Sequence, residues 1–217
     1  MPARIMHMGL ATWLRRLGCL TIVTSAVVGC SDVTSGVAVR QPFVGEDKCT
    51  AVSEPMTTIE PQGAGEPVMR IPHPKNWERT TMLDSELIRF AMANPDLAAN
   101  NFAPSALVTL EDVTAHGGSP EEIFAMEWEG LVKLAGGTDL VTTSDSPVCG
   151  LPAQRVTFTL PRMGAIPPRS GTAIAIVTSG ERKYAAVIGL QTTQPDKPVY
   201  ADDAKTILDG FQIMTDQ

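Results

Sequence analysis

The chain offers few side chains whose type and spacing could bind a metal. Beyond position 30 its histidines are His73 and His116, which lie far apart in the sequence. Neither has the nearby second ligand that zinc sites normally use. His73 stands between two prolines and His116 before two glycines, so we expect exposed turn or loop positions for both. We predict no metal site.

Two pairs of carboxylates could in principle serve glycoside chemistry: Glu121 with Glu122, and Glu127 with Glu129. The first pair lies at the start of a predicted helix, where acids complement the positive end of the helix dipole. The second pair would point to different faces of that helix. We interpret all four as solvated helix charges.

The short motifs of common enzyme classes are missing from the sequence. It contains no Gly-x-Ser-x-Gly elbow, no phosphate-binding loop ending in Gly-Lys-Ser/Thr, and no dinucleotide loop with three spaced glycines. We therefore predict no catalytic residue and no cofactor. An enzyme whose residues assemble only in the folded chain remains an alternative.

Aromatic residues and apolar loops are the remaining candidates for a binding surface. Trp77 and Trp128 could line a cleft, but an aromatic beside an apolar helix face usually packs in the core, and we interpret them so. The loops Gly164–Pro168 and Asn94–Pro104 are apolar yet irregular. We predict that they form the rim of a partner or ligand surface.

Charge and cysteine content limit the partners and the compartment. Arg4, Arg15 and Arg16 precede Cys30 and no acid does, so the remaining chain carries 14 − 24 = −10 charges. This acidity argues against nucleic acid and against electrostatic membrane binding. In an oxidising compartment the pair Cys49 and Cys149 should form a disulfide; two separate thiols are the alternative.

Hydrophobic patterns predict strands and two helices. Ser119-Pro120-Glu121-Glu122 starts a helix that Gly136-Gly137 ends, and one face of this helix should cover a sheet. A second amphipathic helix runs from Ala201 to Phe211. Strands are expected at 68–71, 86–92, 106–113, 140–143, 153–160, 173–178 and 184–191, the last two joined as a hairpin. This order predicts an α+β fold with a mostly antiparallel central sheet flanked by helices.

The first 29 residues have the pattern of an export signal. Three arginines precede the apolar run Leu17–Gly29, which is too short to span a bilayer. Val27-Val28-Gly29-Cys30 resembles the lipobox of bacterial lipoproteins, which implies that the thiol of Cys30 takes a diacylglycerol before the signal is cleaved in front of it. Cleavage by the ordinary signal peptidase is the alternative. Acyl chains on Cys30 would anchor the protein to the extracytoplasmic face of the cell membrane.

The rest of the chain divides into a tether and one domain. Residues 30–67 are rich in Ser, Thr, Gly, Pro and acids and show no sustained apolar period, so we predict a flexible tether that starts at the lipidated cysteine. Residues 68–217 are long enough for a single domain. We expect a monomer.

The domain resembles the LpqN/LpqT family of mycobacterial lipoproteins, whose fold is Mog1/PsbP-like. The resemblance rests on the lipobox, the polar tether, the final helix and the segment from Ile71 to Trp77, where the family shows Ile-Pro-x-Pro-x-x-Trp. The tether is shorter than is usual in the family, and Cys49 with Cys149 is no family signature, so the subfamily stays open.

The resemblance implies a cell-envelope protein without assigned catalysis. Together with the anchor, it predicts a binding or accessory module for an envelope lipid, a glycolipid or a protein partner. A surface lipoprotein that acts on host proteins is a further alternative.

Overall fold

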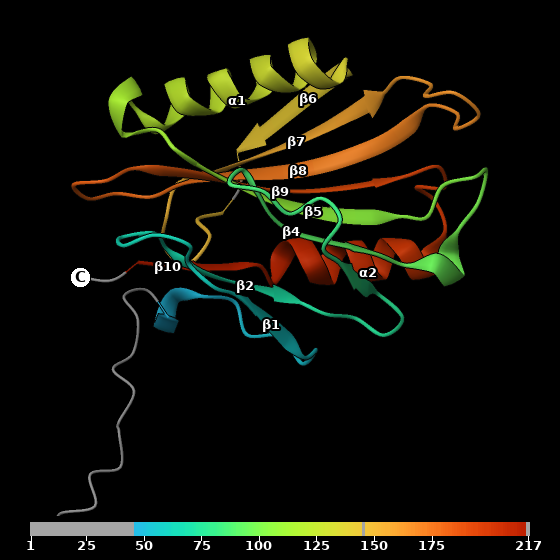
Figure 1. Cartoon of the computed structure of the whole chain (residues 1–217), viewed down its shortest axis with the longest axis horizontal. Helices are drawn as coiled ribbons and strands as arrows, with labels where there is room; N and C mark the ends of the chain where they lie inside the picture. Colours follow the sequence, from blue (N-terminus) through green and yellow to red (C-terminus); the bar gives the residue numbers. More distant parts are fainter. Residues whose placement is uncertain (1–45, 145, 216–217) are drawn as a thin grey trace, which may run out of the picture. The chain divides into compact units, whose positions relative to one another are not determined.

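The computed structural model describes residues 46–144 and 146–215 (Figure 1). The predicted signal peptide, Cys30 and the first part of the predicted tether lie outside these residues. The described part contains ten strands, β1 (Met56–Ile59), β2 (Val68–Pro72), β3 (Glu78–Thr80), β4 (Ile88–Ala93), β5 (Ser105–Asp112), β6 (Thr138–Ser144), β7 (Ala153–Leu160), β8 (Arg169–Val177), β9 (Tyr184–Thr192) and β10 (Gln212–Met214). Its α-helices are α1 (Pro120–Ala135) and α2 (Pro198–Asp209), and its 3-10 turns are Glu46–Lys48, Pro95–Leu97 and Thr114–His116.

The strands form two sheets. Seven strands make a large sheet in the order β3-β4-β5-β9-β8-β7-β6, and three make a small sheet in the order β1-β2-β10. All neighbouring strands in both sheets run antiparallel. The predicted α+β class is therefore confirmed, as is the hairpin between β8 and β9.

The large sheet separates two hydrophobic clusters. Figure 1 shows α1 on one side of this sheet, and α2 with the small sheet on the other. The larger cluster joins the large sheet to α2 and the small sheet, and includes Ile71, Ile188, Ile207 and Phe211. The smaller cluster lies under α1 and includes Phe124, which is 4% exposed.

Helix α1 begins and ends where the sequence predicts. Ser119 and Glu122 form a reciprocal capping box, in which the Ser119 backbone N–H donates to Glu122 Oε2 at 2.8 Å. Gly136 ends the helix in the left-handed conformation, with φ of 70°, which a glycine adopts without steric cost.

The predicted tether is wrong for residues 46–67, which belong to the fold. Strand β1 pairs with β2, and Glu66 forms an ion pair with Arg89. The segment was not predicted because β1 is only four residues long and forms a strand through its pairing with β2 rather than through an apolar period of its own. The same reason applies to β3 and β10, which are three residues long.

Helix α2 starts three residues earlier than predicted. Pro198 is its first residue, a position that suits proline because the missing N–H would have no helical partner there.

Candidate ligand-binding groove

The topology leaves part of the large sheet without a covering helix. Seven strands at spacings of about 4.8 Å span about 29 Å, whereas a helix with its side chains is about 10–12 Å across. Helix α1 is the one α-helix on its side of the sheet in the described part of the chain (Figure 1). It packs most closely on β8, so β9 and β5 extend beyond it.

The side chains of β5 and β9 are buried to different degrees on the two faces of the large sheet. Side chains that point toward α2, such as Val108 and Ile188, are completely buried. Those that point toward α1, such as Leu107, Thr109 and Val187, are only half-buried. A groove with an apolar floor therefore lies beside α1.

This groove, which we call the α1 groove, has a volume of about 480 Å³. That is within the range of roughly 300–1,000 Å³ that small-molecule sites occupy. Helix α1 contributes Met126, Glu127, Trp128, Gly130, Leu131, Leu134 and Ala135. The sheet and the residue before β4 contribute Leu87, Leu107, Thr109, Glu111, Phe158, Leu160, Ala173, Val187, Gly189, Leu190 and Gln191.

Small residues give the α1 groove its depth. Gly189 pairs with Ala173 on one side and Leu107 on the other. A Cβ at Gly189 would have a single neighbour within 4 Å, the Ala173 Cβ at 3.6 Å, and a Cβ at Gly130 would have none. Larger side chains at these positions would fill the groove without displacing a neighbour.

Glu127 faces into the α1 groove, and our interpretation of it as a solvated helix charge is wrong. Burial, and secondarily the nearby charge of Glu111, raise the pKa of Glu127 to about 7. Glu129 does point elsewhere, as predicted: it is exposed and pairs with Lys133. The sequence held a signal for this, because Glu127 lies four residues from both Ile123 and Leu131, on the apolar side of α1.

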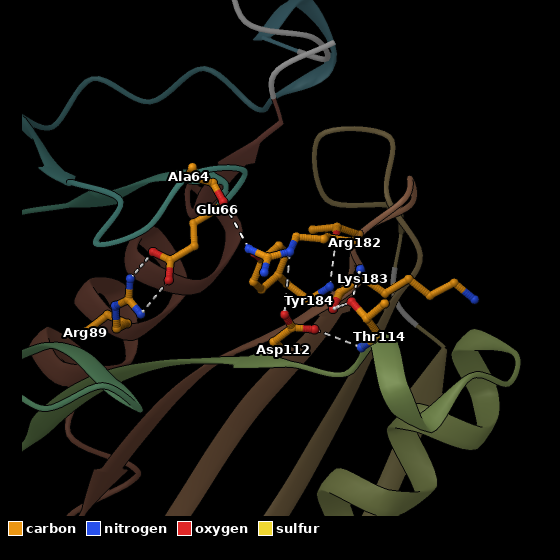
Figure 2. Close-up of polar contacts among 9 residues, drawn as sticks. Ala64, Glu66, Arg89, Asp112, Thr114, Arg182, Lys183 and Tyr184 are labelled. Carbon is orange, nitrogen blue, oxygen red and sulfur yellow. Dashed lines mark hydrogen bonds and ion pairs between the residues drawn. The ribbon is translucent and has the colours of Figure 1, made fainter.

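A second cavity of about 730 Å³ adjoins the α1 groove, and Leu87, Glu111 and Leu134 line both. Figure 2 shows polar contacts around it. The guanidinium of Arg182 donates to Ala64 O at 3.1 Å and to the Tyr184 hydroxyl at 3.3 Å. Charged and polar side chains therefore line much of the second cavity, whereas apolar side chains line most of the α1 groove.

Its two arginines already have acidic partners. The Arg89 side chain is 4% exposed and forms an ion pair with Glu66, and Arg182 Nε lies 4.0 Å from Asp112 Oδ2. Burial alone would raise the pKa of Glu66, but the hydrogen bond and charge of Arg89 hold it below its ordinary value. A hydrogen bond from Thr114 likewise lowers the pKa of Asp112.

Both tryptophans pack in the core, as we expected. Trp77 is 3% exposed and donates from Nε1 to Asp203 Oδ2 at 2.8 Å. Trp128 is 7% exposed and donates to Gln154 Oε1 at 2.5 Å, while its ring also borders the α1 groove.

The prediction of an exposed position is wrong for His73 and correct for His116. His73 is half-buried rather than exposed, because both ring nitrogens find partners: Trp77 O lies 2.5 Å from Nε2 and Thr57 Oγ1 lies 2.9 Å from Nδ1. A carbonyl only accepts, so Nε2 carries the proton. His116 is exposed, as predicted. In residues 46–144 and 146–215, no group of three or more His, Cys, Asp or Glu could hold a metal ion.

The two loops predicted to form a binding rim contribute no residue to the α1 groove. The loop 94–104 instead contacts Arg169, the first residue of β8, which lies over the Phe102 ring at 5.3 Å, and Thr193, whose Oγ1 donates to Ala99 O at 3.1 Å. Sequence patterns did not point to the α1 groove, because its lining comes from α1 and from strand residues far apart in the chain.

The structure joins Cys49 to Cys149, with the sulfur atoms 2.04 Å apart. Cys30, the predicted lipidation site, lies outside the described residues. None of the described helices is long and apolar enough to span a bilayer.

No protein-family model and no curated protein matches the sequence. Among solved structures, the chain is similar to LpqN of Mycobacterium tuberculosis, with a TM-score of 0.56, 15% identity, and coverage of 74% of this chain and 91% of LpqN. It also matches cyanobacterial PsbP from Synechocystis sp. PCC 6803, with a TM-score of 0.47, 8% identity, and coverage of 76% and 95%.

The similarity to LpqN, with a TM-score above 0.5, defines a class of fold. The chain is an α+β protein that shares the fold of LpqN, which is the fold that the family resemblance implied.

Proposed function

We propose that this protein is a non-catalytic module of the cell envelope that binds the hydrocarbon part of an envelope lipid in the α1 groove. The observation that carries the proposal is the apolar groove of about 480 Å³ between α1 and the strands β5 and β9. Apolar surface that stays exposed in the free protein is unfavourable in water, and a hydrocarbon chain would cover it.

The length of the α1 groove supports a chain-like ligand. Its floor runs along β5 and β9 from Glu111, which pairs with Ala185, to Gln191, which pairs with Ser105. Six residues at about 3.4 Å each give about 20 Å. One lipid chain in a bilayer extends about 15 Å, half of the hydrocarbon core, so a single acyl chain fits along this floor.

The lining of the α1 groove supports binding rather than catalysis. Glu127 has the raised pKa of a general acid or base, but the one side-chain hydroxyl among the described lining residues belongs to Thr109. Neither His nor Cys is present in that lining. Covalent catalysis needs a nucleophile within hydrogen-bond reach of a base, and no such pair is formed here.

Two further observations support a place in the envelope. The first 29 residues have the pattern of an export signal, and Val27–Cys30 resembles a lipobox, so we propose that acyl chains on Cys30 anchor the domain outside the cell membrane. LpqN, which shares the fold, is described as involved in cell envelope biogenesis. A Cys30→Ala variant should lose detergent-phase partition and the mass of the lipid, whereas Cys19→Ala should keep both.

Filling the α1 groove tests the binding function. We expect Gly189→Val to remove a lipid that co-purifies with the full chain from its own envelope, as measured by native mass spectrometry. Valine suits a strand better than glycine does, and its Cβ has room, so the fold should persist. Thr142→Val on the exposed strand β6 is the matched control. Equal lipid occupancy in both variants, or no lipid in the unaltered protein, would contradict the proposal.

A further inference from the structure

We infer that the ligand carries a positively charged amine at its polar end, held by Glu111 and Glu127 where the α1 groove meets the second cavity. This inference rests on the proposed function, because it names the class of lipid that the same groove binds.

The charged side chains of the α1 groove all have one sign. Glu111 and Glu127 line it, and no Lys, Arg or His stands among its described lining residues. A fatty acid or a phospholipid with a net negative head would place its charge beside these carboxylates without a compensating base. Such an arrangement is repulsive, and more so in a half-buried site than in water. An ammonium group would be attracted instead.

In the described lining of the second cavity, carboxylates outnumber guanidinium groups by four to two: Glu66, Glu86, Glu111 and Asp112 against Arg89 and Arg182. Arg89 is buried in an ion pair with Glu66. Arg182 is exposed and its Nε lies 4.0 Å from Asp112 Oδ2. A polar head that extends from the α1 groove into this cavity therefore meets an excess of carboxylates.

Glu111 and Glu127 also lack partners within the protein. Neither carboxylate forms a hydrogen bond or an ion pair with any residue in 46–144 or 146–215. Burial and the charge of Glu111 make the ionised form of Glu127 unfavourable, which is the condition that a cation between the two groups would relieve. An ammonium has three donors and no acceptor, so it can serve both carboxylates at once.

The test compares three ligands with the same ten-carbon chain: decylamine, decanoate and decyl glucoside. Each is titrated below its micelle concentration into the full chain carrying Cys30→Ala, which removes the acceptor of the proposed acyl chains and leaves the described residues unchanged. We expect decylamine to bind at least roughly tenfold more tightly than decanoate, the range of a charge-assisted hydrogen bond. The preference should shrink with added salt and in Glu111→Gln and Glu127→Gln, but not in Glu129→Gln on the exposed face of α1.

The pH dependence gives a second readout. Decylamine stays protonated well above pH 8, so its affinity should rise from pH 6 to pH 8 as Glu127 ionises, and this rise should vanish in Glu127→Gln. Glu111 is the other titratable group that lines the α1 groove. Equal or tighter binding of decanoate, or tighter binding of the glucoside, would overturn the amine inference while leaving the groove as a lipid site. Absence of all binding would instead contradict the proposed function.

Discussion

Glu127 shows what a single residue can and cannot reveal before the fold is known. Its four-residue spacing from Ile123 and Leu131 places it on the apolar side of α1. What the spacing cannot tell is whether the sheet beneath that side closes over the carboxylate or leaves a groove. That depends on where α1 lies across seven strands, which is a property of the tertiary structure.

Replacing this carboxylate should stabilise the protein in alkaline solution. The folded state binds the Glu127 proton more tightly than the unfolded chain does, because its pKa rises from 4.5 to about 7. The stabilisation from this proton is complete below about pH 4.5 and is lost as the pH rises through about 7. Glu127→Gln keeps a neutral side chain at every pH. We expect it to raise the free energy of unfolding at pH 8 by about 2–3 kcal/mol.

Urea unfolding at pH 5 and pH 8 measures this effect. The gain should be small at pH 5, where the native Glu127 is already protonated. Glu129→Gln is the matched control, because Glu129 is exposed on the same helix and should change stability by less than about 0.5 kcal/mol at either pH. A gain of the same size at both pH values would show that burial of the charge is not its cause.

At the scale of elements, the sequence predicted what depends on local signals. The capping box at Ser119 and the glycine pair after Ala135 fix both ends of α1, and alternation of apolar residues located β7 and β9. The elements that were missed, β1, β3 and β10, have three or four residues each. They are strands because a partner strand forms hydrogen bonds with their backbone groups. The sequence of so short a segment does not indicate which strand it will pair with.

The α1 groove could not be predicted for a related reason. Its floor combines residues of β5, β7, β8 and β9, so predicting it requires the strand order and register as well as the strands themselves. The small residues that make it deep, Ala173 and Gly189, look in the sequence like ordinary members of a strand. Their role appears only when the register places them side by side.

Helix α1 offers a substitution that should improve stability and impair binding together. Gly130 lies within the helix, and its missing Cβ would point into open space in the α1 groove. Gly130→Ala should raise the free energy of unfolding by about 1 kcal/mol, the helix-propensity difference. The added methyl group narrows the groove, so lipid affinity should fall.

A rise in stability together with a fall in lipid affinity would distinguish a narrowed groove from general damage to the fold, which would lower both. Ala125→Gly, at an exposed position of the same helix, should lower stability by about the same amount and leave lipid binding unchanged. Urea unfolding and titration with decylamine measure the two quantities. A variant Gly130→Ala that binds lipid as tightly as the unaltered chain would show that this part of α1 does not contact the ligand.

On the scale of the whole molecule, the disulfide connects the start of the described chain to its middle. Cys49 follows the turn Glu46–Lys48, and Cys149 lies between β6 and β7, 100 positions later. Residues 46–59 also join the domain through β1, which pairs with β2 alone, through an ion pair between Glu46 and Arg70, and through the Gln212 side chain, which donates to Thr50 O at 3.1 Å. The disulfide is therefore the covalent link that holds this segment against the large sheet.

Removing the disulfide should lower the stability of the whole domain and should affect the local stability of β1 most. A closed loop of about 100 residues restricts the unfolded chain by about 4–5 kcal/mol in the loop-entropy model, so the double variant Cys49→Ser, Cys149→Ser should unfold at a clearly lower urea concentration. Native-state hydrogen exchange should show the largest acceleration in β1, because local opening of that strand no longer works against a covalent link. Strands β5 and β9, each paired on both sides, should exchange only through global unfolding. If every strand accelerated by the same factor, the bond would stabilise the domain as one unit rather than fasten its first strand.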